Sequence, residues 1–252
     1  MVPDKLEKQY RVHVYDTGPD EKLTLFSLFD YLQDIASDHA VLLGYGREDL
    51  VKTRRFWVLS RMYAIINDFP RWGETVVIET WPKGTDKMFA LRDYEVCTPD
   101  GRIMAAATSS WLILDQGTRR ICRPETTLTG NNKELLKRDS LPRNAARLRP
   151  LNENRRILSR FRVRMSDLDV NLHTNNVKYI KWIVDSYSLG FVMNKIPYSV
   201  EINYLSESYL DDVILVLGSE TDESDCTCDY TIQRQDDNTD LCRIKIAWKE
   251  RT

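Results

Sequence analysis

The stretch TLFSLFDYLQDIASDHAVLLG, residues 24–44, carries the clearest structural signal in the chain. Its apolar side chains recur every three or four positions, as they do on one face of a helix. These residues are Leu25, Leu28, Phe29, Leu32, Ile35, Ala36 and Leu43. Thr24 is suited to cap the start of the helix, and Gly44 is suited to end it. We therefore expect one long helix with its apolar stripe buried.

The second half of the chain repeats this order of elements. There Thr174 or Asn175 can cap a helix, and Gly190 can end it. Each half also has an alternating strand before its helix and four strands after it. The expected strands cover residues 10–14, 56–67, 75–81, 89–97, 103–114, 161–165, 198–205, 213–219, 226–233 and 241–248. Because the connections after each helix are short, the strands should pair antiparallel.

A sheet wrapped around one long apolar helix is the hotdog arrangement, and it buries both the helix stripe and one sheet face. The sequence therefore predicts an α+β tandem (double) hotdog, with two antiparallel sheets each wrapped around one long helix. Two such sheets can pair edge to edge, which removes two exposed edges. We expect residues 1–130 to form an N-terminal hotdog, residues 131–154 a polar linker and residues 155–252 a C-terminal hotdog.

The composition sets limits on the function. Of the 252 residues 42% are hydrophobic and 29% charged, which is typical of a globular protein. The formal net charge of -2 gives no overall attraction to nucleic acid or anionic membranes. Five scattered cysteines argue against a disulfide framework. No apolar stretch resembles a signal peptide or reaches the length of a membrane span. We expect a cytoplasmic protein without a nucleic-acid partner.

The candidate site lies just before the second helix, in the stretch DLDVNLH, residues 167–173. An extended backbone would place Asp169, Asn171 and His173 on one side. The intervening apolar side chains, Leu168, Val170 and Leu172, would then face the protein interior.

That row of polar groups suits the hydrolysis of a thioester. The Asn171 amide and N–H groups at the helix start can stabilise an oxyanion. His173 can position or deprotonate water, while Asp169 holds the imidazole or the Asn171 geometry. The alternative is a polar turn that only caps the helix, because Asp, Asn and Thr are common before helices.

Several segments together resemble the plant and bacterial acyl-acyl-carrier-protein (acyl-ACP) thioesterases. The main one is DVNLHTNNVKYI, residues 169–180. The others are WVLSRM (57–62), PRWGE (70–74), AATSSWLILD (106–115) and TRR (118–120). The resemblance covers nearly the whole chain in order. It implies a double hotdog fold, acyl-chain binding mainly in the first half, and catalysis mainly in the second half by Asp169, Asn171 and His173.

A further family position falls in NYLSES, residues 203–208, where plant members have Glu-Cys. Here Glu207 matches the glutamate, and Ser208 replaces the cysteine. The resemblance therefore implies a carboxylate beside His173 but no cysteine nucleophile. We expect water to attack directly, with His173 and Glu207 sharing the general-base role. Attack by Ser208 stays open, since serine needs a well-placed base.

Two further groups of residues are candidates for substrate recognition. The walls of an acyl pocket are expected from the first helix and the strand after it, at Phe29, Leu32, Ile35, Trp57 and Met62. The basic residues in or near the linker can dock an acidic carrier protein. These are Lys137, Arg138, Arg143 and Arg147; a solvated charge run is the alternative reading.

The sequence thus favours hydrolysis of fatty acyl-ACP to free fatty acid and carrier protein, without a metal or an organic cofactor. The alternatives are an acyl-CoA thioesterase on the same residues and a non-catalytic acyl-binding hotdog module. Chain-length preference is left open, as is the choice between a monomer and a homodimer.

Overall fold

Strands β2 (Arg55–Ile66) and β8 (Lys195–Tyr204) pair antiparallel in the middle of one continuous sheet, with Met62 opposite Ile202. Each strand belongs to a different half of the chain, so this pairing joins the two halves. The computed structural model describes residues 4–127, 138–151, 155–219 and 227–251. Every paired strand among them runs antiparallel to its neighbour. The edge-to-edge pairing predicted from the sequence is confirmed.

The sheet order is β1-β3-β4-β5-β2-β8-β11-β10-β9-β7, and β6 extends β5. The first half contains β1 (Leu6–Arg11), α1 (Leu25–Leu42), α2 (Arg47–Lys52), β2, β3 (Thr75–Asp86), β4 (Phe89–Cys97), β5 (Ile103–Asp115), β6 (Ile121–Cys122) and α3 (Pro124–Thr127). The second half contains β7 (Arg155–Arg162), α4 (Asn176–Val184), α5 (Leu189–Asn194), β8, β9 (Val213–Ser219), β10 (Thr227–Arg234) and β11 (Asp240–Glu250). The architecture is the predicted tandem hotdog, with its two sheets fused into one.

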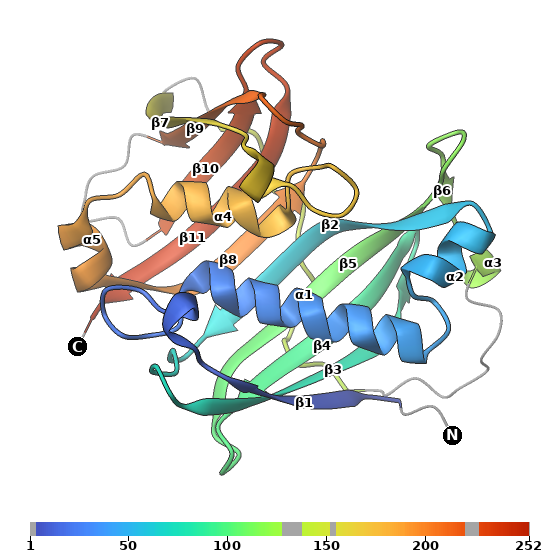
Figure 1. Cartoon of the computed structure of the whole chain (residues 1–252), viewed down its shortest axis with the longest axis horizontal. Coiled ribbons are helices and arrows are strands. Elements are labelled where there is room, and N and C mark those ends of the chain that lie inside the picture. Colours follow the sequence, from blue (N-terminus) through green and yellow to red (C-terminus); the bar gives the residue numbers. More distant parts are fainter. Residues whose placement is uncertain (1–3, 128–137, 152–154, 220–226, 252) are drawn as a thin grey trace.

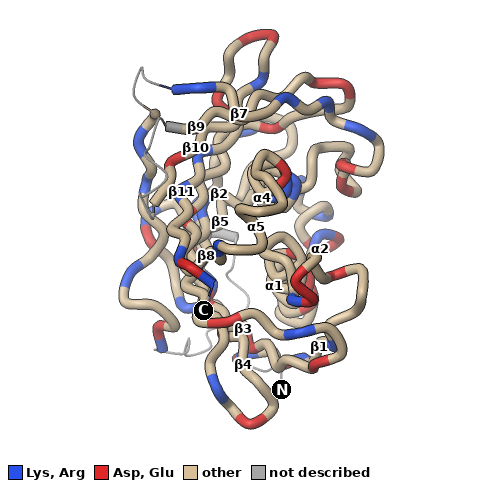
Figure 2. Tube along the Cα trace, turned by 90° about the vertical axis from the view of Figure 1, so that its left-hand side faces the viewer, with Lys and Arg blue, Asp and Glu red and all other residues tan. Residues whose placement is uncertain are grey.

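The helices α1 and α4 lie side by side on the same face of the sheet (Figures 1 and 2). The predicted cap of α1 is confirmed, because the Thr24 side chain accepts the N–H of Ser27. Gly44 follows the helix with a φ of 79°, which is the left-handed conformation that ends helices. No helix in the described part of the chain is both long enough and apolar enough to span a membrane.

The helix of the second half ends earlier than the sequence predicts. Asn175 caps α4 as expected, but the helix stops at Val184, and Gly190 lies inside the separate short helix α5. The Ser186 hydroxyl donates to the Trp182 carbonyl, and the Ser188 side chain accepts the N–H of Phe191. These serine side chains satisfy backbone groups at the end of one helix and the start of the next.

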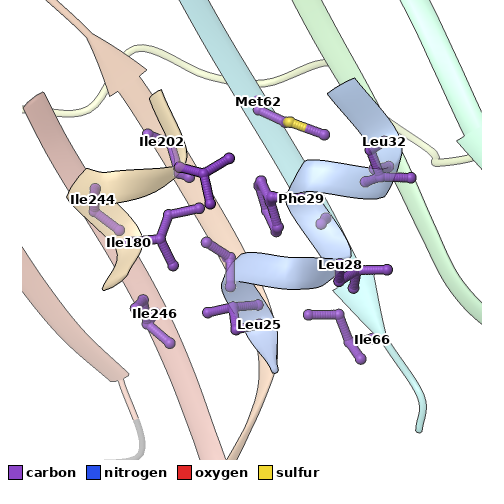
Figure 3. Packing of buried hydrophobic residues seen from close by; sticks show 14 of the residues in the cluster. Leu25, Leu28, Phe29, Leu32, Met62, Ile66, Ile180, Ile202, Ile244 and Ile246 are labelled. Carbon is purple, nitrogen blue, oxygen red and sulfur yellow. The ribbon is translucent and has the colours of Figure 1, made fainter. Parts of the chain in front are cut away.

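One hydrophobic core extends through both halves under the two helices. Figure 3 shows Leu25 and Phe29 of α1 on the side toward Ile180 of α4 and Ile202 of β8, with Leu32 farther along α1. Because the halves share this core and the β2–β8 pairing, the geometry of one half is coupled to that of the other.

The described linker residues 138–151 pass over the opposite face of the sheet. The Ser140 N–H donates to Asp93 over 2.8 Å, and the Leu148 N–H donates to the Asn203 side chain over 2.8 Å. Asp93 lies on β4 next to Tyr94, whose side chain faces the core. Successive side chains on a strand alternate between faces, so the linker covers the face that the helices leave open.

Candidate active site

The loop of residues 168–174 joins a short 3-10 turn, Met165–Asp167, to α4. An isolated bridge between Leu168 and Thr174 closes the loop, and Leu172 has a φ of 63°. The expectation of an extended backbone is therefore wrong, and of the three apolar residues Leu168 alone packs, partly buried, against the core. Val170 and Leu172 are 79% and 70% exposed, because the loop folds back on itself and the alternation of a strand no longer applies.

Asp169 holds the shape of this loop. One carboxylate oxygen accepts the N–H groups of Asn171 and His173 over 2.8 and 3.1 Å. The Asp169 N–H donates to the His173 carbonyl over 2.7 Å. The Asn171 side-chain amide lies 3.4 Å from the second carboxylate oxygen. Asp169 thus fixes the backbone of both residues and does not contact the imidazole.

The imidazole of His173 lies beside Glu207, which is in the β8–β9 loop. Its Nδ1 atom is 3.4 Å from Oε1 of Glu207. The other carboxylate oxygen accepts bonds from Nη2 of Arg119 over 2.8 Å and from the Tyr209 hydroxyl over 3.0 Å. Tyr209 packs edge-to-face on the His173 ring, and the two ring centroids are 5.3 Å apart. Burial and the bond to Glu207 raise the pKa of Tyr209, so its hydroxyl stays a donor.

The sequence interpretation assigned no role to Arg119 or Tyr209. Arg119 belongs to the TRR stretch (118–120) that resembles the family, and this resemblance is the signal in the sequence that could have identified it. The contact itself joins residues 88 positions apart and depends on how the two halves are placed.

Ser208 is fully buried and is held inside the fold. Its hydroxyl lies 2.7 Å from the Thr174 hydroxyl and 2.9 Å from that of Tyr179. The Thr174 N–H donates to the Ser208 carbonyl over 2.9 Å. These contacts anchor the loop to the sheet, which is a structural role.

The turn before α1 has the same backbone structure as the loop before α4. The Gly18 N–H donates to the Lys22 carbonyl, as that of Asp169 donates to His173. Glu21 has a φ of 61°, close to the value for Leu172. In this first copy Lys22 takes the place of His173.

The side chains of the first copy form ion pairs instead of a candidate catalytic group. Lys22 pairs with Asp68 over 2.9 Å, and Asp20, which takes the place of Asn171, pairs with Arg251. The internal repeat thus supplies the scaffold twice, while Asp169, Asn171 and His173 occur only in the second copy.

A pocket lies between the two helices and strands β2, β4, β5 and β8. It is lined by Phe29, Gln33, Leu59, Met62, Tyr94, Trp111, Asn176, Val177 and Tyr204. Two of the predicted wall residues, Phe29 and Met62, are among them. Leu32 and Ile35 are buried in the core, and Trp57 packs edge-on against Trp111 and donates its Nε1–H to the Tyr45 carbonyl.

A polar cluster lies next to the pocket wall in the first half. Nη1 of Arg92 is 3.0 Å from Nδ1 of the fully buried His39 and 3.1 Å from the Thr80 hydroxyl. Burial lowers the pKa of Arg92. Two residues along β4, Tyr94 lines the pocket and contacts Ser109. The interior of this half is therefore not uniformly apolar.

The predicted docking residues have different surroundings. Arg138 contacts Glu79 and Glu95 and lies over the Trp81 ring. Arg143 binds Glu201 through two bonds of 2.6 and 2.9 Å. Both guanidinium groups thus tie the linker to the sheet.

Arg147 is exposed, and its docking role stays a prediction. Lys137 lies outside the described residues. Within the described ranges, no group of three or more His, Cys, Asp or Glu side chains is arranged to hold a metal ion.

Comparison with known proteins identifies relatives across the whole chain. Family models of the acyl-ACP thioesterase N-terminal and C-terminal domains match residues 3–129 and 152–250. A palmitoyl-acyl carrier protein thioesterase of Gossypium hirsutum is 27% identical, covering 96% of this chain and 63% of the relative. The protein of the same name in Arabidopsis thaliana is 27% identical, covering 97% and 64%. The chain thus spans less than two thirds of these relatives.

Solved structures with the same fold include two acyl-ACP thioesterases. An acyl-ACP thioesterase from Bacteroides thetaiotaomicron superposes with a TM-score of 0.86 at 22% identity, covering 98% of both chains. The 12:0-ACP thioesterase from Umbellularia californica superposes with a TM-score of 0.82 at 22% identity, covering 100% of this chain and 96% of the other.

Proposed function

Because the chain belongs to the acyl-ACP thioesterase family, we propose that it hydrolyses fatty acyl-ACP to free fatty acid and the carrier thiol. The observation that carries the proposal is the pairing of His173 with Glu207 at the start of α4, whose first residues line the pocket. An imidazole can act as a general base, and the apolar side chains among those that line the pocket would contact an acyl chain.

In the proposed reaction, Nε2 of His173 removes a proton from water while Nδ1–H donates to Glu207. The water oxygen bonds to the carbonyl carbon of the thioester. When the tetrahedral intermediate collapses, the carbon–sulfur bond breaks, and the proton on His173 passes to the leaving thiolate. The products are the carboxylic acid and the carrier thiol. Ser208 takes no part, because its hydroxyl is buried and already bonded.

The oxyanion would be stabilised at the start of α4. The Val177 N–H is bonded to the Asn175 side chain, and the Lys178 N–H to the Asn175 carbonyl. Among the described residues this leaves the N–H of Asn176, which lines the pocket, without a partner. Together with the Asn171 amide it is our candidate donor, since the first N–H groups of a helix attract negative charge.

The acyl chain would enter the pocket, where Phe29 and Met62 of the first half provide apolar walls. Acyl binding by the first half and catalysis by the second are thus parts of this proposal. We also propose that the protein is cytoplasmic and that it works as a monomer or a homodimer. The β2–β8 pairing already joins two hotdogs in one chain.

The test is release of free acid and thiol by the wild type from matched C8 to C18 acyl-ACP and acyl-CoA substrates. A higher kcat/KM with the carrier-bound series supports the proposal. A preference for acyl-CoA would keep the chemistry and change the substrate. No turnover of either series by the folded protein would contradict the thioesterase assignment and favour a non-catalytic acyl-binding module.

A further inference from the structure

A hairpin of the first half contributes a charged side chain to the candidate site of the second. Arg119 lies in the turn between β5 and β6, and its Nη2 donates to Oε2 of Glu207 over 2.8 Å. The side chains of Arg119 and Glu207 are 50% and 30% exposed. The contact is therefore at the surface, and its geometry has to be held by other groups.

The turn that presents Arg119 is ordered by Asp115. One oxygen of its carboxylate accepts the N–H groups of Gly117 and Thr118 over 3.1 and 2.8 Å, and the Thr118 hydroxyl over 2.9 Å. The Arg119 N–H donates to the Asp115 carbonyl over 2.9 Å, with Arg119 at a φ of 56°. The guanidinium then lies over the Phe56 ring, 5.2 Å from its centroid. The Asp115 turn thus fixes the backbone of Arg119, and the Phe56 ring supports its guanidinium group next to Glu207.

On the other side of the contact, Glu207 divides its two oxygens between different tasks. Oε2 accepts the bonds from Arg119 and Tyr209, and Oε1 lies 3.4 Å from Nδ1 of His173. The Glu207 carbonyl accepts a bond of 2.6 Å from Arg234. With one oxygen occupied by two donors, rotation of the carboxylate is restricted and the other oxygen is directed at the imidazole.

We propose that Arg119 is a positioning residue for hydrolysis, acting through Glu207 to hold the His173 imidazole in its working orientation and tautomer. This inference rests on the proposed function. It makes the active site composite, because the turn of the N-terminal half supplies a group that the C-terminal half lacks.

An exposed arginine beside the site also has a competing role, which is contact with the acidic carrier protein. That role affects binding of the carrier and not the chemical step. A substrate without a carrier, such as an acyl-pantetheine thioester, separates the two roles. A docking residue would be irrelevant to its turnover, whereas a positioning residue would not.

The experiment compares wild type with Arg119→Gln, Arg119→Lys and Tyr209→Phe, using acyl-ACP and acyl-pantetheine of one chain length. Arg120→Gln is the matched control, because Arg120 is exposed and its side chain has no bond within the described residues. We expect Arg119→Gln to lower kcat by about 10-fold or more on both substrates, with little change in KM. Arg119→Lys should restore part of the loss, and Tyr209→Phe should show a smaller loss of the same kind.

A loss of kcat on acyl-pantetheine, with partial recovery in Arg119→Lys, is a readout that a docking role would not produce. If Arg119→Gln kept the wild-type kcat on acyl-pantetheine, or changed only the KM for acyl-ACP, the inference would be overturned and the proposed function would stay intact. No turnover by the folded wild type would overturn the proposed function and this inference with it.

Discussion

Nδ1 of His173 lies 3.4 Å from Oε1 of Glu207, on two loops that the fold brings together from separate parts of the second half. A carboxylate in that position favours the tautomer with the proton on Nδ1 and leaves Nε2 as the base. In the proposed mechanism, the imidazolium that forms during proton transfer is stabilised by the same contact.

This relationship predicts the effect of Glu207→Gln. The amide keeps the size of the side chain but loses the charge, so we expect kcat/KM to fall by about 10²-fold. Steady-state hydrolysis of acyl-ACP provides the measurement, with Glu48→Gln on the exposed side of α2 as control. Equal loss in both variants, or none in Glu207→Gln, would remove Glu207 from the mechanism.

Substitution of Ser208 should affect stability more than activity. Ser208→Ala removes the bonds to Thr174 and Tyr179, which we expect to lower the free energy of unfolding by about 1 kcal/mol. Urea unfolding measures that change, and the turnover rate should stay within about threefold of wild type. If a folded variant instead turned over more slowly by about three orders of magnitude, a serine nucleophile would be indicated.

The pocket should limit acyl-chain length at Leu59. A larger side chain there fills space beside Met62 and Trp111, so Leu59→Trp should lower kcat/KM for long chains by about 10-fold relative to short ones. Val58→Trp on the other face of β2 is the control. The readout is the ratio of kcat/KM between C16 and C8 acyl-ACP. The same ratio in Leu59→Trp and wild type would place the acyl chain elsewhere.

The linker contact predicts a pH-dependent stability. Burial of Glu201 alone would raise its pKa, but the bonds from Arg143 and the Ala146 N–H outweigh burial and hold the pKa below the ordinary 4.5. A lowered carboxyl pKa stabilises the fold at pH above the unfolded value, and this contribution is lost as the pH falls below about 4.5.

We therefore expect Glu201→Gln to lower the free energy of unfolding by about 2 kcal/mol at pH 7. The difference from wild type should shrink at pH 4 and below. Urea unfolding at both pH values checks this, with the exposed Glu7→Gln as control. A difference that grows at low pH would contradict the assigned sign.

The long-range architecture followed from the sequence because its signals were long and consistent. The apolar stripe of α1 runs along a helix of 18 residues and has a capping residue at its start. The end of α4 could not be located in the same way, since Ser186 and Ser188 decide it by bonds to individual backbone groups.

The candidate site was only partly predictable. Alternation over seven residues suggested a strand, but the loop is shaped by Asp169 and by the left-handed Leu172, so Val170 and Leu172 face solvent. The Arg119–Glu207 contact depends on the β2–β8 pairing and the β5–β6 turn. Neither local periodicity nor spacing contains that information.

The most direct test of the account is the kcat/KM of His173→Ala on the preferred acyl-ACP substrate, beside wild type and His13→Ala. His13 is exposed in the first half and is absent from the candidate site, so its replacement should leave kcat/KM unchanged. The account predicts a fall by about 10²-fold or more for His173→Ala in a folded protein. Hydrolysis at the wild-type rate by that variant would contradict the central claim that His173 activates the attacking water.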